Sequence, residues 1–185
     1  MAQPSLRDYD LTTALYPSVE TLGYYRPSLR DEHAMASIQP GDPAPNVILP
    51  LHDGTRVALA DLWAQHVVVL FFYPKDNTAV CTKEACAFRD SYEKFLEAGA
   101  TVVGVSSDSD ESHGDFASRN RLPFLLASDP DGALRKAFAV PKTLGLIPGR
   151  VTYVIDRQGV VRHIFSAQFA ADAHVREAMD AVRSL

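Results

Sequence analysis

Residues 67–73 form an uninterrupted apolar run, Val-Val-Val-Leu-Phe-Phe-Tyr, made of β-branched and aromatic side chains with one leucine. A strand that is exposed on one face alternates polar and apolar residues, so an unbroken run of this composition predicts a strand buried on both faces. Such a strand needs a layer of structure on each side. We therefore expect residues 67–73 at the centre of a sheet that is covered on both faces.

Helical and strand patterns alternate after this run. The periodicity and the turn residues predict a helix at Val80–Ala98, a strand at Thr101–Ser106, a helix at Glu111–Asn120 and a strand at Phe124–Ser128. This βαβαβ order is typical of a sheet with parallel strands and helical crossovers.

Further strands are expected on either side of this region. A small hairpin is predicted from Val47–Leu51 and Arg56–Leu59, because Asp53-Gly54 between them readily forms a tight turn. Later segments predict a short helix at Ala133–Phe138, strands at Val151–Ile155 and Val160–Phe165, and a closing helix at Asp172–Arg183. The fold class that follows is α/β, with a mixed central sheet flanked by helices.

The chain of 185 residues is predicted to hold one domain and an N-terminal extension. Residues 1–37 form the extension, and residues 38–185 form the domain. The extension contains four of the seven tyrosines, at positions 9, 16, 24 and 25. Two interpretations stay open for it: a loosely ordered tail, or a segment whose tyrosines pack on the domain or on a partner.

The overall composition limits the classes of partner. A formal net charge of -5 makes nucleic acid an unexpected partner, and no apolar run reaches the length of a membrane span. The first thirty residues lack the basic start and apolar stretch of a signal peptide, so a cytoplasmic location is expected. Two cysteines are too few for a disulfide scaffold, which points to redox or metal chemistry.

Both cysteines lie in the segment that directly follows the predicted central strand. Ligands collect at the carboxyl ends of strands in open α/β sheets, so this is where a site is expected. Thr78 is suited to be the N-cap of the next helix, which places Cys81 at the third helical position. The partial positive charge of a helix start favours the thiolate, which is the nucleophilic form of cysteine. The alternative for Cys81 is a small buried apolar side chain.

Helical spacing separates the two cysteines. Cys81 belongs to an apolar stripe, whereas Cys86 lies on the polar flank of the same helix. The stripe consists of Cys81, Ala85, Phe88, Tyr92, Phe95 and Leu96. A five-residue step in an intact helix separates the Cα atoms by roughly 8.5 Å, and a disulfide closes without backbone movement only below ~7 Å. A bond between the two cysteines would therefore require the first turns to unwind.

The residues around Cys81 resemble a known family. Pro74, Thr78 and Cys81 match the Pro-x-x-x-Thr-x-x-Cys motif of peroxiredoxins. The longer run 72–90 looks like the peroxiredoxin Q branch, also called bacterioferritin comigratory protein, as do Gly41-Asp42-x-Ala-Pro, Asp53-Gly54 and Gly149-Arg150-Val-Thr-Tyr-Val-Ile-Asp. The sequence departs from the branch at residues 79 and 80, Ala-Val, where Pro-Gly is usual, and in the extension before residue 38.

The resemblance implies a thioredoxin-like fold and the reduction of hydrogen peroxide or organic hydroperoxides, without a cofactor. It makes Cys81 the peroxidatic residue and Cys86 the resolving residue, with recycling by thioredoxin or a similar dithiol donor. Thr78 would hold the peroxide near the sulfur, Pro74 would shield the pocket from water, and Arg150 would favour the thiolate and orient the peroxide. Glu84 would either join this network or lie exposed. The branch includes monomers and dimers, so a monomer or weak homodimer is expected.

Three other classes of function fit the sequence less well than a peroxiredoxin does. A copper-binding or zinc-binding module is the main alternative from a different class, but none of the histidines lies near the cysteines in the sequence; these are His33, His52, His66, His113, His163 and His174. A cysteine hydrolase would need a histidine base and a family signature that the sequence does not show. A disulfide reductase of the thioredoxin type normally has two residues between its cysteines, whereas this chain has four.

Overall fold

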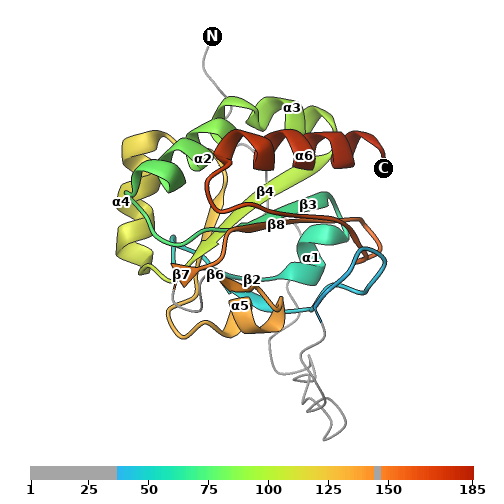
Figure 1. Cartoon of the computed structure of the whole chain (residues 1–185), viewed down its shortest axis with the longest axis horizontal. Coiled ribbons are helices and arrows are strands. Elements are labelled where there is room, and N and C mark those ends of the chain that lie inside the picture. The colour runs from blue at the N-terminus through green and yellow to red at the C-terminus, as the bar shows by residue number, and fades with distance from the viewer. Residues whose placement is uncertain (1–36, 144–146) are drawn as a thin grey trace, which may run out of the picture. The chain divides into compact units, whose positions relative to one another are not determined.

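The computed structural model describes residues 37–143 and 147–185 (Figure 1). The predicted N-terminal extension, apart from residue 37, lies outside these ranges. A five-stranded sheet with the order β5-β4-β3-β8-β9 occupies the centre of the described part. Its strands are β3 (Val67–Phe72), β4 (Ala100–Ser106), β5 (Leu125–Ser128), β8 (Val151–Ile155) and β9 (Val161–Ser166).

The predicted central strand is confirmed. All six residues of β3 are buried, and β3 lies between β4 and β8. β3 and β4 are parallel, as are β4 and β5, while β8 runs antiparallel to both of its neighbours, β3 and β9. The sheet is therefore mixed, as expected.

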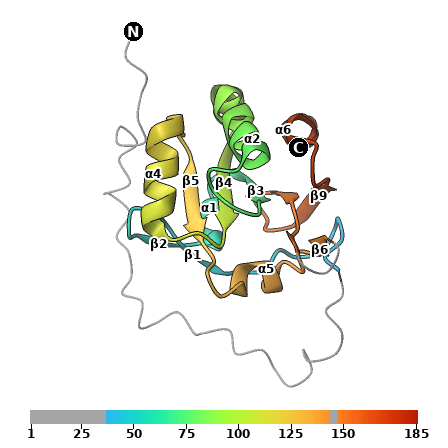
Figure 2. The same cartoon turned by 60° about the vertical axis from the view of Figure 1, so that its left-hand side comes forward.

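Helices cover the two faces of this sheet (Figure 2). One face carries α2 (Ala79–Asp90), α3 (Tyr92–Glu97), α4 (Asp110–Asn120) and α6 (Ala171–Arg183). The other face carries α1 (Leu59–Trp63), α5 (Ala133–Ala137) and the predicted hairpin, β1 (Ile48–Pro50) and β2 (Arg56–Ala58). The glycine of the Asp53-Gly54 turn has a φ of +85°, a value that glycine adopts without strain.

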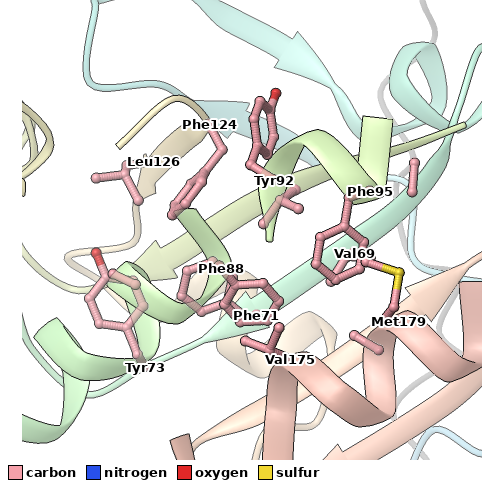
Figure 3. Packing of buried hydrophobic residues seen from close by; sticks show 14 of the residues in the cluster. Val69, Phe71, Tyr73, Phe88, Tyr92, Phe95, Phe124, Leu126, Val175 and Met179 are labelled. Carbon is pink, nitrogen blue, oxygen red and sulfur yellow. The ribbon is translucent and has the colours of Figure 1, made fainter. Parts of the chain in front are cut away.

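Alternate residues of β3 enter two separate apolar cores. Phe71 faces α2 and α6, where its ring stacks on Phe88 with a centroid distance of 4.5 Å (Figure 3). Phe72 faces the opposite core and packs against Phe138 and Tyr153. Burying each such aromatic side chain contributes about 1.5–3 kcal/mol, so Phe88 is a strong anchor for α2.

Three local predictions were incomplete. The helix predicted at 80–98 is two helices, because the backbone at Ser91 leaves the helical conformation and its N–H bonds to Phe88 rather than to residue 87. Leu59, expected at the end of the hairpin strand, is instead the first residue of α1, a helix that was not predicted. The short pair β6 (Lys142–Thr143) and β7 (Ile147–Pro148) was not expected.

Strand and helix ends differ from the predictions by one or two residues elsewhere, as terminal assignments commonly do. Within the described residues, no helix combines the length and the apolar character that a membrane span requires.

Candidate active site

A buried polar network holds the loop between β3 and α2. The Asp76 carboxylate, 4% exposed, accepts hydrogen bonds from the Tyr73 hydroxyl at 2.7 Å and from the Ser112 hydroxyl at 2.8 Å. His113 Nδ1 lies 2.8 Å from the same carboxylate, and His113 Nε2 lies 3.2 Å from the carbonyl oxygen of Ala127. Both ring nitrogens of His113 thus lie within hydrogen-bond distance of oxygen atoms. The network fixes the loop against α4 and β5.

The charge state of Asp76 follows from these contacts. Burial raises the pKa of Asp76, but the hydrogen bonds from His113, Tyr73 and Ser112 and the charge of His113 outweigh it, so the pKa lies below its usual value. Burial, and in second place the charge of the same carboxylate, raise the pKa of the Tyr73 hydroxyl well above its usual value. Asp76 is therefore an ionised acceptor at neutral pH, and Tyr73 is a neutral donor.

Cys81 lies at the third position of α2, as predicted, and its side chain is 2% exposed. The amides of the first helical turn have no carbonyl partner within the helix, so the Cys81 N–H is available to a ligand. Arg150 Nη2 donates a hydrogen bond to the Cys81 sulfur at 3.1 Å. The Cys81 sulfur therefore faces a guanidinium and lies in the first turn of a helix.

Two further contacts fix the Arg150 guanidinium. Nη1 donates to the Glu84 carboxylate, and Nε donates to the carbonyl oxygen of Gln168 at 3.0 Å. Glu84 was expected either to join this network or to lie exposed, and in the structure it is fully buried within the network. Because Glu84 and Cys81 share one face of α2, a single helix presents both the sulfur and the anion that orients Arg150.

His174 of α6 lies behind Glu84. Its Nε2 lies 2.9 Å from the Ala167 carbonyl oxygen and its Nδ1 lies 2.8 Å from the Thr152 hydroxyl. Burial and the charge of Arg150 lower the pKa of His174 to about 4, although the bond to Ala167 opposes them. The neutral ring donates from Nε2 and accepts at Nδ1, so Glu84 Oε1, 3.6 Å from Nδ1, has no hydrogen-bond donor within the described residues.

The other predicted site residues lie in the loop and on α2. Thr78 is the N-cap residue by its backbone conformation, but its hydroxyl donates to the Lys75 carbonyl oxygen at 3.1 Å instead of capping a helical amide. Pro74 is half-buried between Tyr73 and Lys75. The structure therefore places Thr78 and Pro74 in the loop before Cys81, while Arg150 reaches the sulfur from the start of β8.

Cys86 lies away from this cluster, and both cysteines are free thiols. The Cys86 thiol donates to the Asn120 side-chain oxygen at 3.8 Å, at the end of α4. Arg89 Nη1 donates to the Asn120 carbonyl oxygen at 2.8 Å. The pKa of Arg89 is raised, chiefly by the hydrogen bond that Arg89 donates to Asp90. Burial acts in the opposite direction, and negative charge at Cys86 raises the pKa further. Cys86 is thus on a polar flank, as predicted, and α4 partly covers it.

Three of these groups were not found by sequence reasoning. Asp76, His113 and His174 come from segments far apart in the chain, and each has a polar type that is usually exposed. The signal that identifies them is their burial with satisfied partners, which appears only after folding.

Comparison with known proteins agrees with this geometry. Residues 40–164 match the model of the AhpC/TSA family. The chloroplastic peroxiredoxin Q of Oryza sativa subsp. japonica is 45% identical over 157 residues, which cover 84% of this chain and 72% of the relative. That of Sedum lineare is 46% identical over 158 residues, covering 85% and 84%. The chain belongs to the peroxiredoxin Q branch of the AhpC/TSA family.

Solved structures of peroxiredoxins share the fold. Peroxidoxin BcpB from Mycobacterium tuberculosis is 37% identical, with a TM-score of 0.74 over 80% of this chain and 98% of that chain. A PrxQ mutant from Xylella fastidiosa is 30% identical, with the same TM-score and coverage. The thioredoxin-like fold is confirmed, and this peroxiredoxin is a thiol peroxidase. The copper-binding alternative is not favoured, and within residues 37–143 and 147–185 no three histidine, cysteine or acidic side chains gather into a possible metal site.

Proposed function

We propose that this peroxiredoxin reduces hydrogen peroxide and organic hydroperoxides with Cys81 as the peroxidatic residue and Cys86 as the resolving residue. The observation that carries the proposal is the contact of 3.1 Å between Arg150 Nη2 and the Cys81 sulfur, at the start of α2. It joins a nucleophile to a fixed cation that can also stabilise a departing oxygen.

The first step transfers one oxygen atom. The Cys81 thiolate attacks the terminal oxygen of the peroxide, so that an S–O bond forms and the O–O bond breaks. Cys81 becomes a sulfenic acid, and the other oxygen leaves as hydroxide or alkoxide and takes up a proton to give water or an alcohol. Arg150 and the free Cys81 N–H stabilise the charge that develops on the oxygens. Thr78 orients the peroxide after its hydroxyl turns from Lys75, and Pro74 limits the access of water.

The second step forms a disulfide. The Cys86 sulfur attacks the sulfenic sulfur of Cys81, an S–S bond forms, and the sulfenic oxygen leaves as water with the proton from the Cys86 thiol. A dithiol such as thioredoxin then attacks the Cys86 sulfur and releases Cys81 as thiolate. This attack leaves a mixed disulfide between Cys86 and the reductant. The second thiol of the reductant then attacks the reductant's own sulfur in that bond, so that Cys86 is released as a thiol and the reductant leaves as a disulfide, which closes the cycle.

Setting and assembly also belong to the proposal. A cytoplasmic location and a monomer or weak homodimer are the predictions from the sequence, while the plant relatives are named chloroplastic.

A turnover assay tests the proposal. Peroxide consumption is followed with thioredoxin, thioredoxin reductase and NADPH for the wild type, Cys81→Ser and Cys86→Ser. We expect turnover only in the wild type, because each variant lacks one sulfur of the disulfide. Sustained turnover by Cys81→Ser would overturn the proposal, and sustained turnover by Cys86→Ser would remove the intramolecular disulfide from it.

A further inference from the structure

A second arginine, Arg135 of α5, lies beneath the cysteine site. Its Nη2 donates to the carbonyl oxygen of Tyr73, and its Nη1 donates to the carbonyl oxygen of Gly149 at 3.1 Å. Tyr73 immediately precedes Pro74, and Gly149 immediately precedes Arg150. One planar guanidinium therefore joins the backbone of the loop that leads to Cys81 to the backbone that carries the arginine on the sulfur.

The position of this bridge in the sheet explains why it is needed. β3 and β8 pair antiparallel as far as Phe72 opposite Val151, where the strand pairing ends. The Tyr73 N–H is directed to β4, where it donates to the Val105 carbonyl oxygen at 3.0 Å. Beyond this last pair, Arg135 supplies the connection between the two diverging segments. Its rigid fork of donors fixes the spacing of the two carbonyl groups in a way that a flexible ammonium group does not.

The surroundings of Arg135 hold the guanidinium in place. The buried Asp129 carboxylate accepts hydrogen bonds from the N–H groups of Leu134 and Arg135, at 2.8 Å and 3.0 Å, and so anchors α5 to the end of β5. The guanidinium carbon lies 5.7 Å from the centre of the Phe72 ring, within range of a cation–π contact.

Gly149 is fixed from its other side as well. A Cβ atom at this position would overlap the carbonyl oxygen of Pro141, so the backbone here packs directly against residue 141. The segment that delivers Arg150 is thus held between the Pro141 carbonyl group and the Arg135 guanidinium. A shift of Arg135 would leave only one of these two restraints.

Arg135 also interacts electrostatically with the site. Burial lowers the pKa of Arg135, while the negative charge of Asp129 acts in the opposite direction. The Nε of Arg135 is buried and has no acceptor within the described residues.

We propose that Arg135 is a positioning residue for peroxide reduction, which sets the separation of the Cys81 loop and Arg150 by bridging the carbonyl groups of Tyr73 and Gly149. This inference rests on the proposed roles of Cys81 and Arg150. Arg135 can act through the fixed geometry of its guanidinium and through its charge. Substitutions by lysine and by glutamine distinguish these two effects. Lysine retains the charge without the fork, whereas glutamine loses both.

Two reactions of Cys81 distinguish positioning from a structural role. Peroxide reduction depends on the placement of Arg150, whereas alkylation by iodoacetamide depends only on the amount and exposure of thiolate. Both second-order rate constants are measured in a Cys86→Ser background, so that only Cys81 reacts. For Arg135→Lys we expect the peroxide rate to fall by on the order of tenfold to a hundredfold, with alkylation within about twofold of the background. For Arg135→Gln we expect both rates to fall.

The matched control is Lys136→Gln, which removes an exposed cation from the neighbouring position of α5. We expect both of its rates to equal those of the background. Arg135→Lys carries the test if Arg135→Gln does not fold, as judged by thermal unfolding. A peroxide rate for Arg135→Lys within about twofold of the background would overturn the inference, as would a parallel loss of peroxide and alkylation rates in that variant.

Failure of the inference is distinguishable from failure of the proposed function. Cys81→Ser is run in the same stoichiometric peroxide assay. Peroxide reduction by Cys81→Ser would remove Cys81 as the reacting residue and with it the proposed function. Loss of reaction in Cys81→Ser together with an unaffected Arg135→Lys would overturn the role of Arg135 alone.

Discussion

Arg150 and Glu84 form a buried ion pair next to the Cys81 sulfur. Removing one partner of such a pair leaves an uncompensated buried charge, which costs far more than an exposed pair contributes. The pair is therefore a means of orientation: Glu84 and the Gln168 carbonyl group hold the guanidinium so that Nη2 faces Cys81. This arrangement gives a prediction for Arg150 that separates orientation from charge.

We expect Arg150→Lys to slow the stoichiometric reaction with hydrogen peroxide by on the order of a hundredfold, the loss typical of one donor to developing oxygen charge. Lysine keeps a cation beside the Glu84 carboxylate, so the variant avoids an isolated buried charge. Its single ammonium group cannot contact Glu84, Gln168 and the peroxide in fixed geometry. Rapid mixing with peroxide measures the rate. A rate constant within about twofold of the wild type would exclude Arg150 from the site.

At the residue scale, the sequence predicted the residues of the motif but not the buried residues that hold them in position. Pro74, Thr78 and Cys81 are recognisable because they lie within one short segment. His174 and Arg135 are not, because their partners are carbonyl groups and side chains of distant segments that only the folded sheet brings close. The sequence left two placements open for Glu84, exposed or within the network. The choice depends on Arg150, which is far away in the sequence and lies beside Glu84 only in the folded chain.

At the scale of elements, α2 must change for the two sulfurs to meet. Cys81 lies on its buried face, whereas Cys86 contacts Asn120 at the end of α4. The first turns carry small apolar side chains, Cys81 and Ala85, and the large anchor, Phe88, comes only later. Unwinding the start of α2 therefore loses less apolar burial than unwinding past Phe88, but it also moves the buried Glu84 away from Arg150.

Amide hydrogen exchange tests this expectation. In the oxidised form we expect faster exchange across residues 78–90, most strongly before Phe88, together with lower helical circular dichroism, both reversed by a dithiol. Helix α3 serves as an internal control, because its residues Tyr92 and Phe95 remain packed on the sheet. If exchange in residues 78–90 is unchanged after mass spectrometry has verified the disulfide, an intact helix does not keep the cysteines apart.

The elements themselves show which patterns carry information. β3 was predictable because an unbroken apolar run of β-branched and aromatic residues has few alternatives. The break at Ser91 was not, because the apolar stripe continues from Phe88 to Tyr92 across it. Helix α1 has five residues, too few to show a helical period.

At the scale of the whole molecule, His174 couples stability to pH. Its pKa is about 4 in the folded state, lowered by burial from the ordinary value of 6.5. Between these values the unfolded chain binds a proton that the folded chain does not, so the free energy of unfolding falls as the pH falls from 6.5 to about 4. The total loss is on the order of 3 kcal/mol. Carboxyl groups whose pKa is lowered by folding, such as those of Asp76 and Asp156, reduce the free energy of unfolding only when the pH falls below their ordinary pKa of 3.8.

Urea unfolding at several pH values, compared between the wild type and His174→Gln, measures this contribution. Glutamine can keep one bond to Thr152 or Ala167 but does not titrate. We expect the dependence of stability on pH between 6.5 and 4 to be weaker in His174→Gln than in the wild type. Equal slopes in the two proteins would show that His174 does not remain neutral in the fold.

The identity of the first sulfur to be oxidised tests the account most directly. Each variant is treated with one equivalent of hydrogen peroxide in the presence of dimedone, which traps sulfenic acid, and the adduct is located by mass spectrometry. Cys86→Ser should consume the peroxide and carry the adduct on Cys81, because Arg150 and the start of α2 activate that sulfur. Cys81→Ser should neither consume peroxide at a comparable rate nor form the adduct. An adduct on Cys86 in Cys81→Ser, with none on Cys81 in Cys86→Ser, would contradict the account.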